Sequence, residues 1–432
     1  MRPLLRKWPG IRWLHPGLGV KRWILLLVAG ITVLSIGLAY LLVMIYRQQP
    51  LPEPFYYVTL QFLPRWVRAL LFTVVGLGFI GAAFYQLNRS LISVLVLALP
   101  AERRQEVSPS HPNDEKGPHI VVLGGGHGLS TLLRGLKNHT NNLTAIVTVA
   151  DDGGSSGILR KEMGLLPPGD LRNCIAALAR AEPLMTQLFQ YRFGRGTGLD
   201  GHAFGNLFIA AMAEITGSFE SAISEVSRVL AVQGRILPSS LENVALYAEV
   251  RPRSDPAAAP VLVYGQSQIA QAGGMVERVY LQPSTARGYP EAIRAILSAD
   301  MIVLGPGSLY TSLLPNLLVS DINNAVRACR GIKVFVCNVA TQPGETDGYD
   351  VGDHVRALCA HLSVGFCDYV LANSNTEFSL PPQSGSVMVQ PTCDGAERFR
   401  LILENLVDRE LPWRHDPEKL ATALMRLYYA HG

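Results

Sequence analysis

A glycine-rich turn between an apolar run and a helical pattern is the first feature of this sequence that could do chemistry. The apolar run covers residues 120–123, and Gly124, Gly125, Gly126, His127 and Gly128 follow it. Glycines allow positive φ angles and bring backbone N–H groups close to a ligand, and the N-terminus of a helix favours an anion. The turn therefore predicts a phosphate site, with a tight strand-to-helix turn that binds nothing as the alternative.

The spacing of these glycines differs from the two common phosphate-binding motifs. The dinucleotide pattern G-x-G-x-x-G, counted from Gly124, would need a glycine at position 129, where the chain has Leu129. The turn also lacks the Gly-Lys-Ser/Thr ending of the P-loop. Neither motif is therefore assigned.

Two carboxylates follow a second apolar run, at residues 143–149. Asp151 and Asp152 come about 25 residues after the first glycines, near the distance at which a carboxylate contacts ribose hydroxyls in nucleotide-binding folds. They could also hold Mg²⁺ beside a diphosphate. An Asp-Gly turn that needs no ligand is the third interpretation.

Further polar residues stand next to predicted strand ends and helix starts. Asp170 opens a predicted helix and is explained as well by an N-cap as by catalysis. No histidine and aspartate can be assigned to Ser308 as partners of a catalytic triad, so we expect Ser308 to contact a phosphate or a hydroxyl. His202 is better explained as a structural donor than as a base. The remaining candidates are Arg172, Asn173, Asn206, Gly305, Gly307, Asn338, Gln342 and Arg414.

The elements that must position these residues alternate between apolar runs and helical patterns from residue 119 onward. This alternation predicts an α/β fold with a doubly wound, mostly parallel sheet and helices on both faces. Ligands bind such sheets beyond the carboxyl ends of the strands, where three of the turns should meet. The expected strands are residues 120–123, 143–149, 244–250, 260–264, 277–281, 301–304 and 333–337, the middle three being a candidate meander. The expected helices include residues 170–179, 204–215 and 219–230.

The first hundred residues have a different character. Residues 1–22 are basic, and residues 23–46 are apolar without a charge, long enough at ~1.5 Å per residue to cross a bilayer core of ~30 Å. Residues 69–87 are a second, thinner apolar run, for which a buried core helix is the alternative. We expect a membrane hairpin within 23–100, a linker at 101–118 and a cytoplasmic α/β domain at 119–432, with both termini cytoplasmic because basic residues flank the hairpin.

Composition narrows the classes of partner. The net charge of the 432-residue chain is +4 and no basic stripe carries interleaved aromatic residues, so no nucleic acid is expected. The six cysteines include no C-x-x-C pair and fit reduced thiols of a cytosolic domain better than disulfides or zinc. The sequence leaves the oligomeric state open, a homo-oligomer being one alternative.

Seven ordered motifs lie between about residues 118 and 430: GGGHGLSTLLRGLK, VTVADDGGSSG, PPGDLRNCIAALA, GHAFGNL, VLGPGSLYTSLLPNLLV, CNVATQPGETDGY and RHDPEKLA. Together they resemble the gluconeogenesis factor family, in the superfamily of 2-phospho-L-lactate transferase. The resemblance implies a Rossmann-like fold and a nucleotide-sugar ligand such as UDP-N-acetylglucosamine. It also implies a regulatory role in gluconeogenic growth and in cell shape or the cell wall.

The resemblance assigns roles to the candidate residues. The glycines between 124 and 128 would hold the diphosphate, and Asp151 and Asp152 would meet ribose or metal. Asn206 and the Gly305–Ser308 loop would line the cleft. The resemblance also places Arg414 on the nucleotide sugar.

Two departures from the pattern of the family bear on the activity and on the location of the protein. The segment PPGDLRN stands where the transferase branch, which moves a phospholactyl group with Mg²⁺, carries a more acidic segment. A binding regulator is therefore the first interpretation and a Mg²⁺-dependent transferase using Asp151, Asp152 and Asp170 the second, with a scaffold that binds no ligand as the third. Compact, cytoplasmic members of the family lack the two N-terminal spans, so this chain is expected at the inner or plasma membrane.

Overall fold

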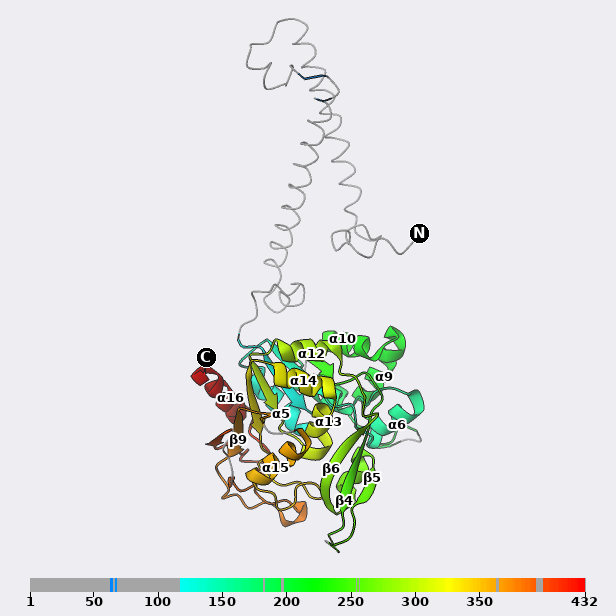
Figure 1. Cartoon of the computed structure of the whole chain (residues 1–432). Coiled ribbons are helices and arrows are strands. Elements are labelled where there is room, and N and C mark those ends of the chain that lie inside the picture. Colours follow the sequence, from blue (N-terminus) through cyan, green and yellow to red (C-terminus); the bar gives the residue numbers. More distant parts are fainter. Residues whose placement is uncertain are drawn as a thin grey trace, which may run out of the picture. The chain divides into compact units, whose positions relative to one another are not determined.

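The computed structural model describes residues 117–431 except 182, 196, 197, 254, 256, 363, 364 and 394–398, together with residues 63, 64 and 67 (Figure 1). The chain divides into two units, Met1–His111 and Pro112–Gly432. The predicted basic segment, membrane hairpin and most of the linker lie outside the described residues and stay predictions. In the described part of the chain, no helix combines the length and the apolar character needed to cross a bilayer.

Seven parallel strands form the central sheet. They are β1 Ile120–Gly124, β2 Leu143–Val147, β3 Arg235–Pro238, β7 Met301–Leu304, β8 Ile332–Val336, β9 Tyr369–Asn373 and β10 Arg400–Glu404, in the order β10-β9-β8-β7-β1-β2-β3. Every residue of β1, β2, β7 and β9 is buried. These strands are continuous apolar runs because both faces of a parallel sheet are covered.

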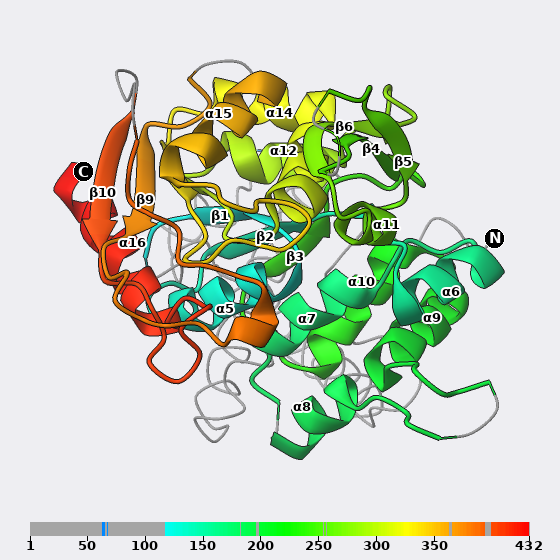
Figure 2. The same ribbon diagram turned by 90° about the horizontal axis from the view of Figure 1, so that it is seen from below.

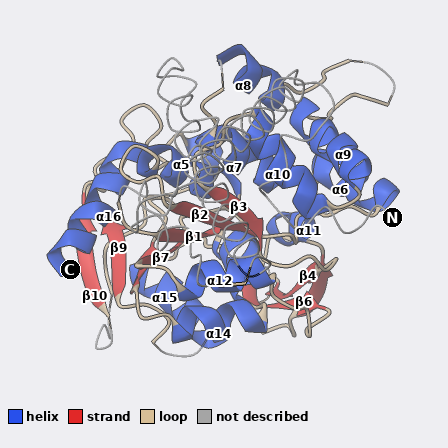
Figure 3. Cartoon of the chain, turned by 90° about the horizontal axis from the view of Figure 1, so that it is seen from above, coloured by secondary structure: helices blue, strands red, loops and turns tan. Residues whose placement is uncertain are grey.

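Helices cover both faces of the sheet, as Figures 2 and 3 show. One face carries α5 Gly126–Leu136, α7 Gly169–Leu178 and α16 Pro417–His431, and the other carries α12 Pro290–Leu297, α14 Ser320–Ala328 and α15 Val351–Leu362. The predicted α/β fold with a mostly parallel sheet is thus confirmed. The other described helices are α6 Gly154–Met163, α8 Pro183–Gln190, α9 Phe204–Thr216, α10 Phe219–Val229, α11 Gln266–Gln271, α13 Leu314–Leu317, the π-helix η3 Leu309–Leu313 and the 3₁₀ helix η4 Pro382–Ser384.

A smaller antiparallel sheet contains β4 Ala245–Arg251, β5 Val261–Tyr264 and β6 Met275–Gln282, in the order β5-β4-β6. Three strands were expected here, but the meander is wrong. β4 comes first in the chain and yet lies between the other two, pairing antiparallel with both.

The strand order reverses between β1 and β7. From β1 the sheet grows outward to β3, and the chain then returns to add β7 on the other side of β1 and grows outward to β10. In doubly wound sheets, the crevice beyond the carboxyl ends of the strands at such a reversal binds ligands. The two glycine loops, one after β1 and one after β7, both open onto this point.

Candidate functional site

A cavity of about 370 Å³ lies at this reversal point, between the loops that follow β1, β2, β7 and β8. Most of the residues predicted from the sequence line it, although binding by them stays a prediction. The predicted residues that line it are Gly125, Gly126, His127, Gly128, Asp151, Asp170, Gly307, Ser308, Asn338, Gln342 and Arg414.

The glycine turn presents the N-terminus of α5 to the cavity. Gly126 begins the helix at φ +63, a left-handed conformation that favours glycine. A Cβ placed on Gly126 would meet no atom closer than Oγ of Ser312, at 3.9 Å, so this backbone borders open space. The first turn of α5 has no acidic residue. The positive end of α5 faces the cavity, where the carboxylate of Asp170 already accepts the N–H of Gly126.

The neighbouring glycines allow close packing instead. A Cβ on Gly125 would lie 2.4 Å from Oδ2 of Asp170, and one on Gly128 would lie 2.6 Å from the carbonyl oxygen of Pro306. Side chains at these two positions would push the surrounding walls of the cavity apart. The glycines thus have two roles. Gly126 borders the open cavity, and Gly125 and Gly128 allow the walls of the cavity to pack closely.

The loop after β7 is held by side chains from the loop after β8. Gly307 has φ +157, and its N–H donates to Oδ1 of Asn338 at 3.2 Å while Nδ2 of Asn338 donates to the Gly307 carbonyl oxygen at 2.9 Å. Nε2 of Gln342 donates to Oγ of Ser308 at 2.8 Å. Asn338 and Gln342 therefore position this loop, in addition to lining the cavity.

Two carboxylates form the acidic side of the cavity. Burial raises the pKa of Asp151, although the N–H of Gly153 donates to its Oδ1 at 3.0 Å. Burial, and after it the nearby charge of Asp151, raises the pKa of Asp170 to about 7, although its carboxylate accepts the N–H of Gly126. Two half-buried carboxylates with raised pKa values can share a proton, accept a hydrogen bond from a sugar hydroxyl or bind a cation.

The opposite rim is basic and aromatic. Arg414 is exposed at the rim, next to Trp413, whose exposed fraction is 38%. Burial, and after it the positive charge of Arg414, lowers the pKa of His127, so its imidazole is neutral at pH 7. Nε2 of the buried His415 lies 3.2 Å from the carbonyl oxygen of Cys337, and burial lowers its pKa to about 4. Arg414 is therefore the side chain suited to a phosphate.

Two predicted residues support the site without lining it. Asp152 accepts the N–H of Ser267 at 2.9 Å and so caps α11 instead of facing a ligand. Nδ2 of the buried Asn206 donates to Oγ of Ser155 at 3.0 Å. Nδ1 of the buried His202 lies 3.1 Å from the same Ser155 oxygen.

Four further predicted residues also lie behind the surface of the cavity. Arg172 does not reach it, since its Nη2 donates to Oδ1 of Asn173 at 2.9 Å. Gly124 ends β1 inside the sheet, where its carbonyl oxygen accepts Nδ2 of Asn316 at 3.0 Å. Gly305 is buried beneath the loop it begins.

Several lining residues were not among the predicted site residues. Thr341 lies in the motif CNVATQPGETDGY, and Trp413 and His415 lie at the start of the motif RHDPEKLA or next to it. The other lining residues are Thr131, Gln266, Pro306, Ser312, Val339, Ala340 and Ser386. Across the described ranges, no group of three or more His, Cys, Asp or Glu residues is placed to hold a metal ion.

Known proteins resemble this chain closely. Residues 120–403 match the family model of the 2-phospho-L-lactate transferase CofD. A Nostoc sp. protein named "Putative gluconeogenesis factor" is 43% identical over 96% of this chain and 92% of its own length. The Bacillus subtilis "Gluconeogenesis factor" is 45% identical over 72% of this chain and 98% of its own length. A crystal structure of a UPF0052 family member from Bacillus halodurans superposes with a TM-score of 0.66 at 43% identity, over 72% of this chain and 99% of that chain.

Proposed function

This chain belongs to the gluconeogenesis factor group of the CofD family, and from that premise we propose that its α/β domain binds a nucleotide sugar of the UDP-N-acetylglucosamine type. The protein would act as a regulator of gluconeogenic growth and cell shape, without turning its ligand over. The observation that carries the proposal is the N-terminus of α5 at Gly126, which borders an open cavity at the reversal of the sheet.

The two sides of the cavity suit the two parts of a nucleotide diphosphate. The N–H groups of α5 and the guanidinium of Arg414 complement phosphate oxygens, because both supply positive charge at the same cavity. The carboxylates of Asp151 and Asp170 complement ribose hydroxyls, which donate hydrogen bonds. Exposed Trp413 offers a ring for the base.

Calorimetric titration of residues 112–432 tests this proposal. This fragment corresponds in extent to the crystallised Bacillus halodurans relative, which covers 72% of the chain. UDP-N-acetylglucosamine, GDP and NAD would each be titrated with and without Mg²⁺, followed by long incubation and product analysis. Tight binding of the UDP-sugar without product supports the regulator. If none of the three nucleotides binds, the proposal is overturned, and the interpretation of the domain as a scaffold that binds no ligand remains.

A Mg²⁺-dependent transferase is the second candidate, favoured by one observation. Asp151 and Asp170 both have raised pKa values at the same cavity wall, and Mg²⁺ is commonly held by one or two carboxylates together with phosphate oxygens. When bound there, the ion would neutralise charge on a phosphate. Preference for a guanine nucleotide, strict dependence on Mg²⁺ and formation of product would establish this activity in place of the regulator.

We also propose that residues 23–100 tether the domain to the plasma membrane on its cytoplasmic side. The support is the pair of apolar runs in the sequence and the Nostoc relative, whose match to 96% of this chain extends into the N-terminal hundred residues. Cell fractionation of the full chain and of residues 112–432 tests the tether. Recovery of the full chain in the soluble fraction would contradict the proposed tether.

A further inference from the structure

A second cavity, of about 470 Å³, lies beside the first. Ser386 lines both, so the two cavities meet at this residue. The residues that line the second cavity include Tyr349, Asp350, Phe378, Val387 and Met388.

The wall between the cavities consists of two paired extended segments. Ala340 and Met388 form an antiparallel bridge, and the N–H of Thr341 donates to the carbonyl oxygen of Val387 at 2.8 Å. Ala340 and Thr341 line the first cavity, whereas Val387 and Met388 line the second. A ligand long enough to pass Ser386 would therefore contact both sides of this one ladder.

The second cavity has no basic side chain like Arg414 of the first among the described residues that line it. None of the described residues that line it is a lysine, arginine or histidine, and its one charged side chain is Asp350. Burial acts to raise the pKa of Asp350, but hydrogen bonds from the Thr392 hydroxyl and the Asp353 N–H outweigh it and leave this pKa below its usual range. Arg356, which does not line the cavity, lies near Asp350, and its positive charge also lowers this pKa. Within the cavity, the ionised carboxylate attracts hydroxyl donors.

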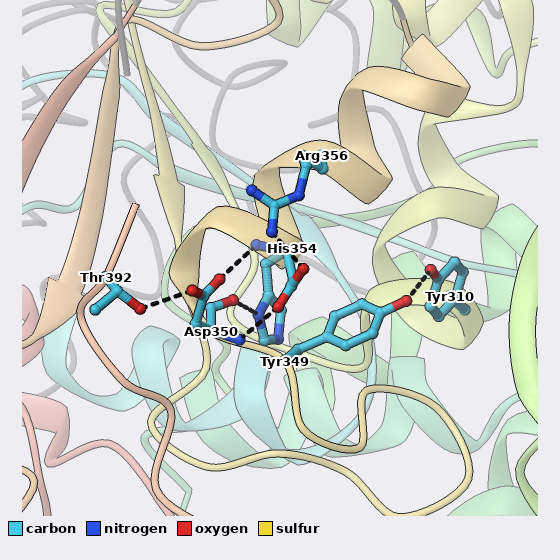
Figure 4. A network of polar contacts seen from close by, with 7 residues as sticks. Tyr310, Tyr349, Asp350, His354, Arg356 and Thr392 are labelled. Atoms are coloured by element: carbon cyan, nitrogen blue, oxygen red, sulfur yellow. Dashed lines mark hydrogen bonds and ion pairs between the residues drawn. The ribbon is translucent and has the colours of Figure 1, made fainter. Parts of the chain in front are cut away.

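The walls around Asp350 are aromatic and firmly held. Tyr349 shares a hydroxyl–hydroxyl hydrogen bond with Tyr310 at 2.9 Å, and Asp350 is fixed by Thr392 at 2.6 Å, as Figure 4 shows. Tyr310 belongs to η3, which also carries Ser312 of the first cavity. Phe378 is half-buried on another wall. Aromatic rings beside a carboxylate suit a pyranose, which has an apolar C–H face and hydroxyl edges.

We propose that the second cavity is the glycosyl subsite, where the sugar of the nucleotide sugar lies after its diphosphate has passed Ser386. This inference rests on the proposed function and adds to it the place of the sugar. The hydroxyls of the sugar donate to Asp350, and its C–H face packs on Phe378. Exposed Trp413 lies on the wall of the first cavity, so the base and the sugar occupy different cavities.

Titrations of UDP and UDP-N-acetylglucosamine against three variants test the subsite. Phe378→Ala should lower the affinity for the UDP-sugar about tenfold while leaving UDP within about twofold. Asp350→Asn should act in the same direction without loss of fold, because asparagine caps the start of α15 as well as aspartate does. Tyr429→Ala removes an exposed aromatic ring near the end of α16 and should change neither affinity.

The outcomes separate this inference from the proposed function. One outcome is that the wild type binds both UDP and the UDP-sugar, and that the folded variants Phe378→Ala and Asp350→Asn lower the two affinities equally or not at all. This outcome overturns the subsite, whereas nucleotide-sugar binding stands. If the wild type binds neither compound, both ideas are overturned. Thermal unfolding of each variant shows that it is folded at the temperature of the titration.

Discussion

Asn338 and Gly307 exchange two hydrogen bonds at the wall of the first cavity, with Gly307 N–H donating at 3.2 Å and the Asn338 amide donating back at 2.9 Å. One side chain from the loop after β8 thus fixes the backbone of the loop after β7. Because Gly307 lies opposite the glycine turn, Asn338 sets the distance between the two walls that a diphosphate would contact.

Replacement of Asn338 by alanine should therefore weaken ligand binding. Loss of the two hydrogen bonds leaves the Gly307 backbone free to shift, at a cost of about 1–2 kcal/mol, or roughly tenfold in Kd for UDP-N-acetylglucosamine. Calorimetric titration measures the loss. Asn138→Ala, at an exposed position near the end of α5, is the control and should bind as the wild type does. Wild-type affinity in Asn338→Ala would show that the loop keeps its shape without this side chain.

Replacement of Gly126 by alanine should abolish detectable binding. The new Cβ projects into the cavity where the anion would lie, and the left-handed φ of +63 adds strain of roughly 1–2 kcal/mol. Gly164 offers a matched control outside the lining of the cavity, because it has φ +66 and a Cβ placed on it would meet no atom within 4 Å. Gly164→Ala should thus lose similar stability and keep its affinity. Equal binding by the two variants would exclude the glycine turn from the site.

The stability of the domain should depend on pH through Asp170. Its pKa is about 7 in the folded protein against an ordinary 3.8, so the folded state binds more protons between these values. The free energy of unfolding must then fall as the pH rises from about 4 to about 7. Asp170→Asn removes this dependence on pH. The free energy of unfolding of the variant should exceed that of the wild type by about 2 kcal/mol at pH 8, and this difference should shrink toward pH 4.

Urea unfolding at several pH values measures this dependence. Asp200→Asn, at an exposed position outside the cavity, serves as the control and should follow the wild-type curve. A wild-type curve parallel to that of Asp170→Asn would show that Asp170 ionises as easily in the folded chain as in the unfolded one.

Replacement of Arg414 by alanine should lower the affinity for the UDP-sugar by about 10- to 100-fold at low salt, because a charge-assisted contact to phosphate is lost. The difference from the wild type should shrink as salt is added, since Arg414 is exposed and its charge is screened. Arg409, also exposed and five residues earlier, provides Arg409→Ala as the control. A loss in Arg409→Ala equal to that in Arg414→Ala would indicate a general charge effect.

Strands β1, β2, β7 and β8 of the central sheet and the centre of the site could be predicted because their sequence signals are local, whereas β3, β9 and β10 were not expected. The buried strands β1 and β7 are uninterrupted apolar runs, and each is followed at once by glycines. Parallel strands bring their carboxyl ends to one edge, so the two loops were expected at the same edge, and the strand order that places β7 beside β1 brings Gly126 and Gly307 together.

The rest depends on tertiary contacts that one sequence does not display. Asp151 and Asp152 are adjacent and chemically identical, and only the contact of Asp152 with the distant Ser267 turns one of them away from the cavity. Ser386 lies in a segment without regular helix or strand structure, and its place is set by pairing of its neighbours with residues near 340. Strand β10 is a half-exposed edge strand, so it lacks the continuous apolar run of the central strands.

The packing of α16 against α5 has a consequence for how the protein is made. Gly135 of α5 lies so close to the Pro417 carbonyl of α16 that a Cβ would not fit, and Arg414 stands just before this helix. The glycine turn leaves the ribosome near the start of the α/β domain, whereas the opposite rim of the cavity emerges near its end. A nascent chain therefore has no complete cavity until almost the whole domain is synthesised.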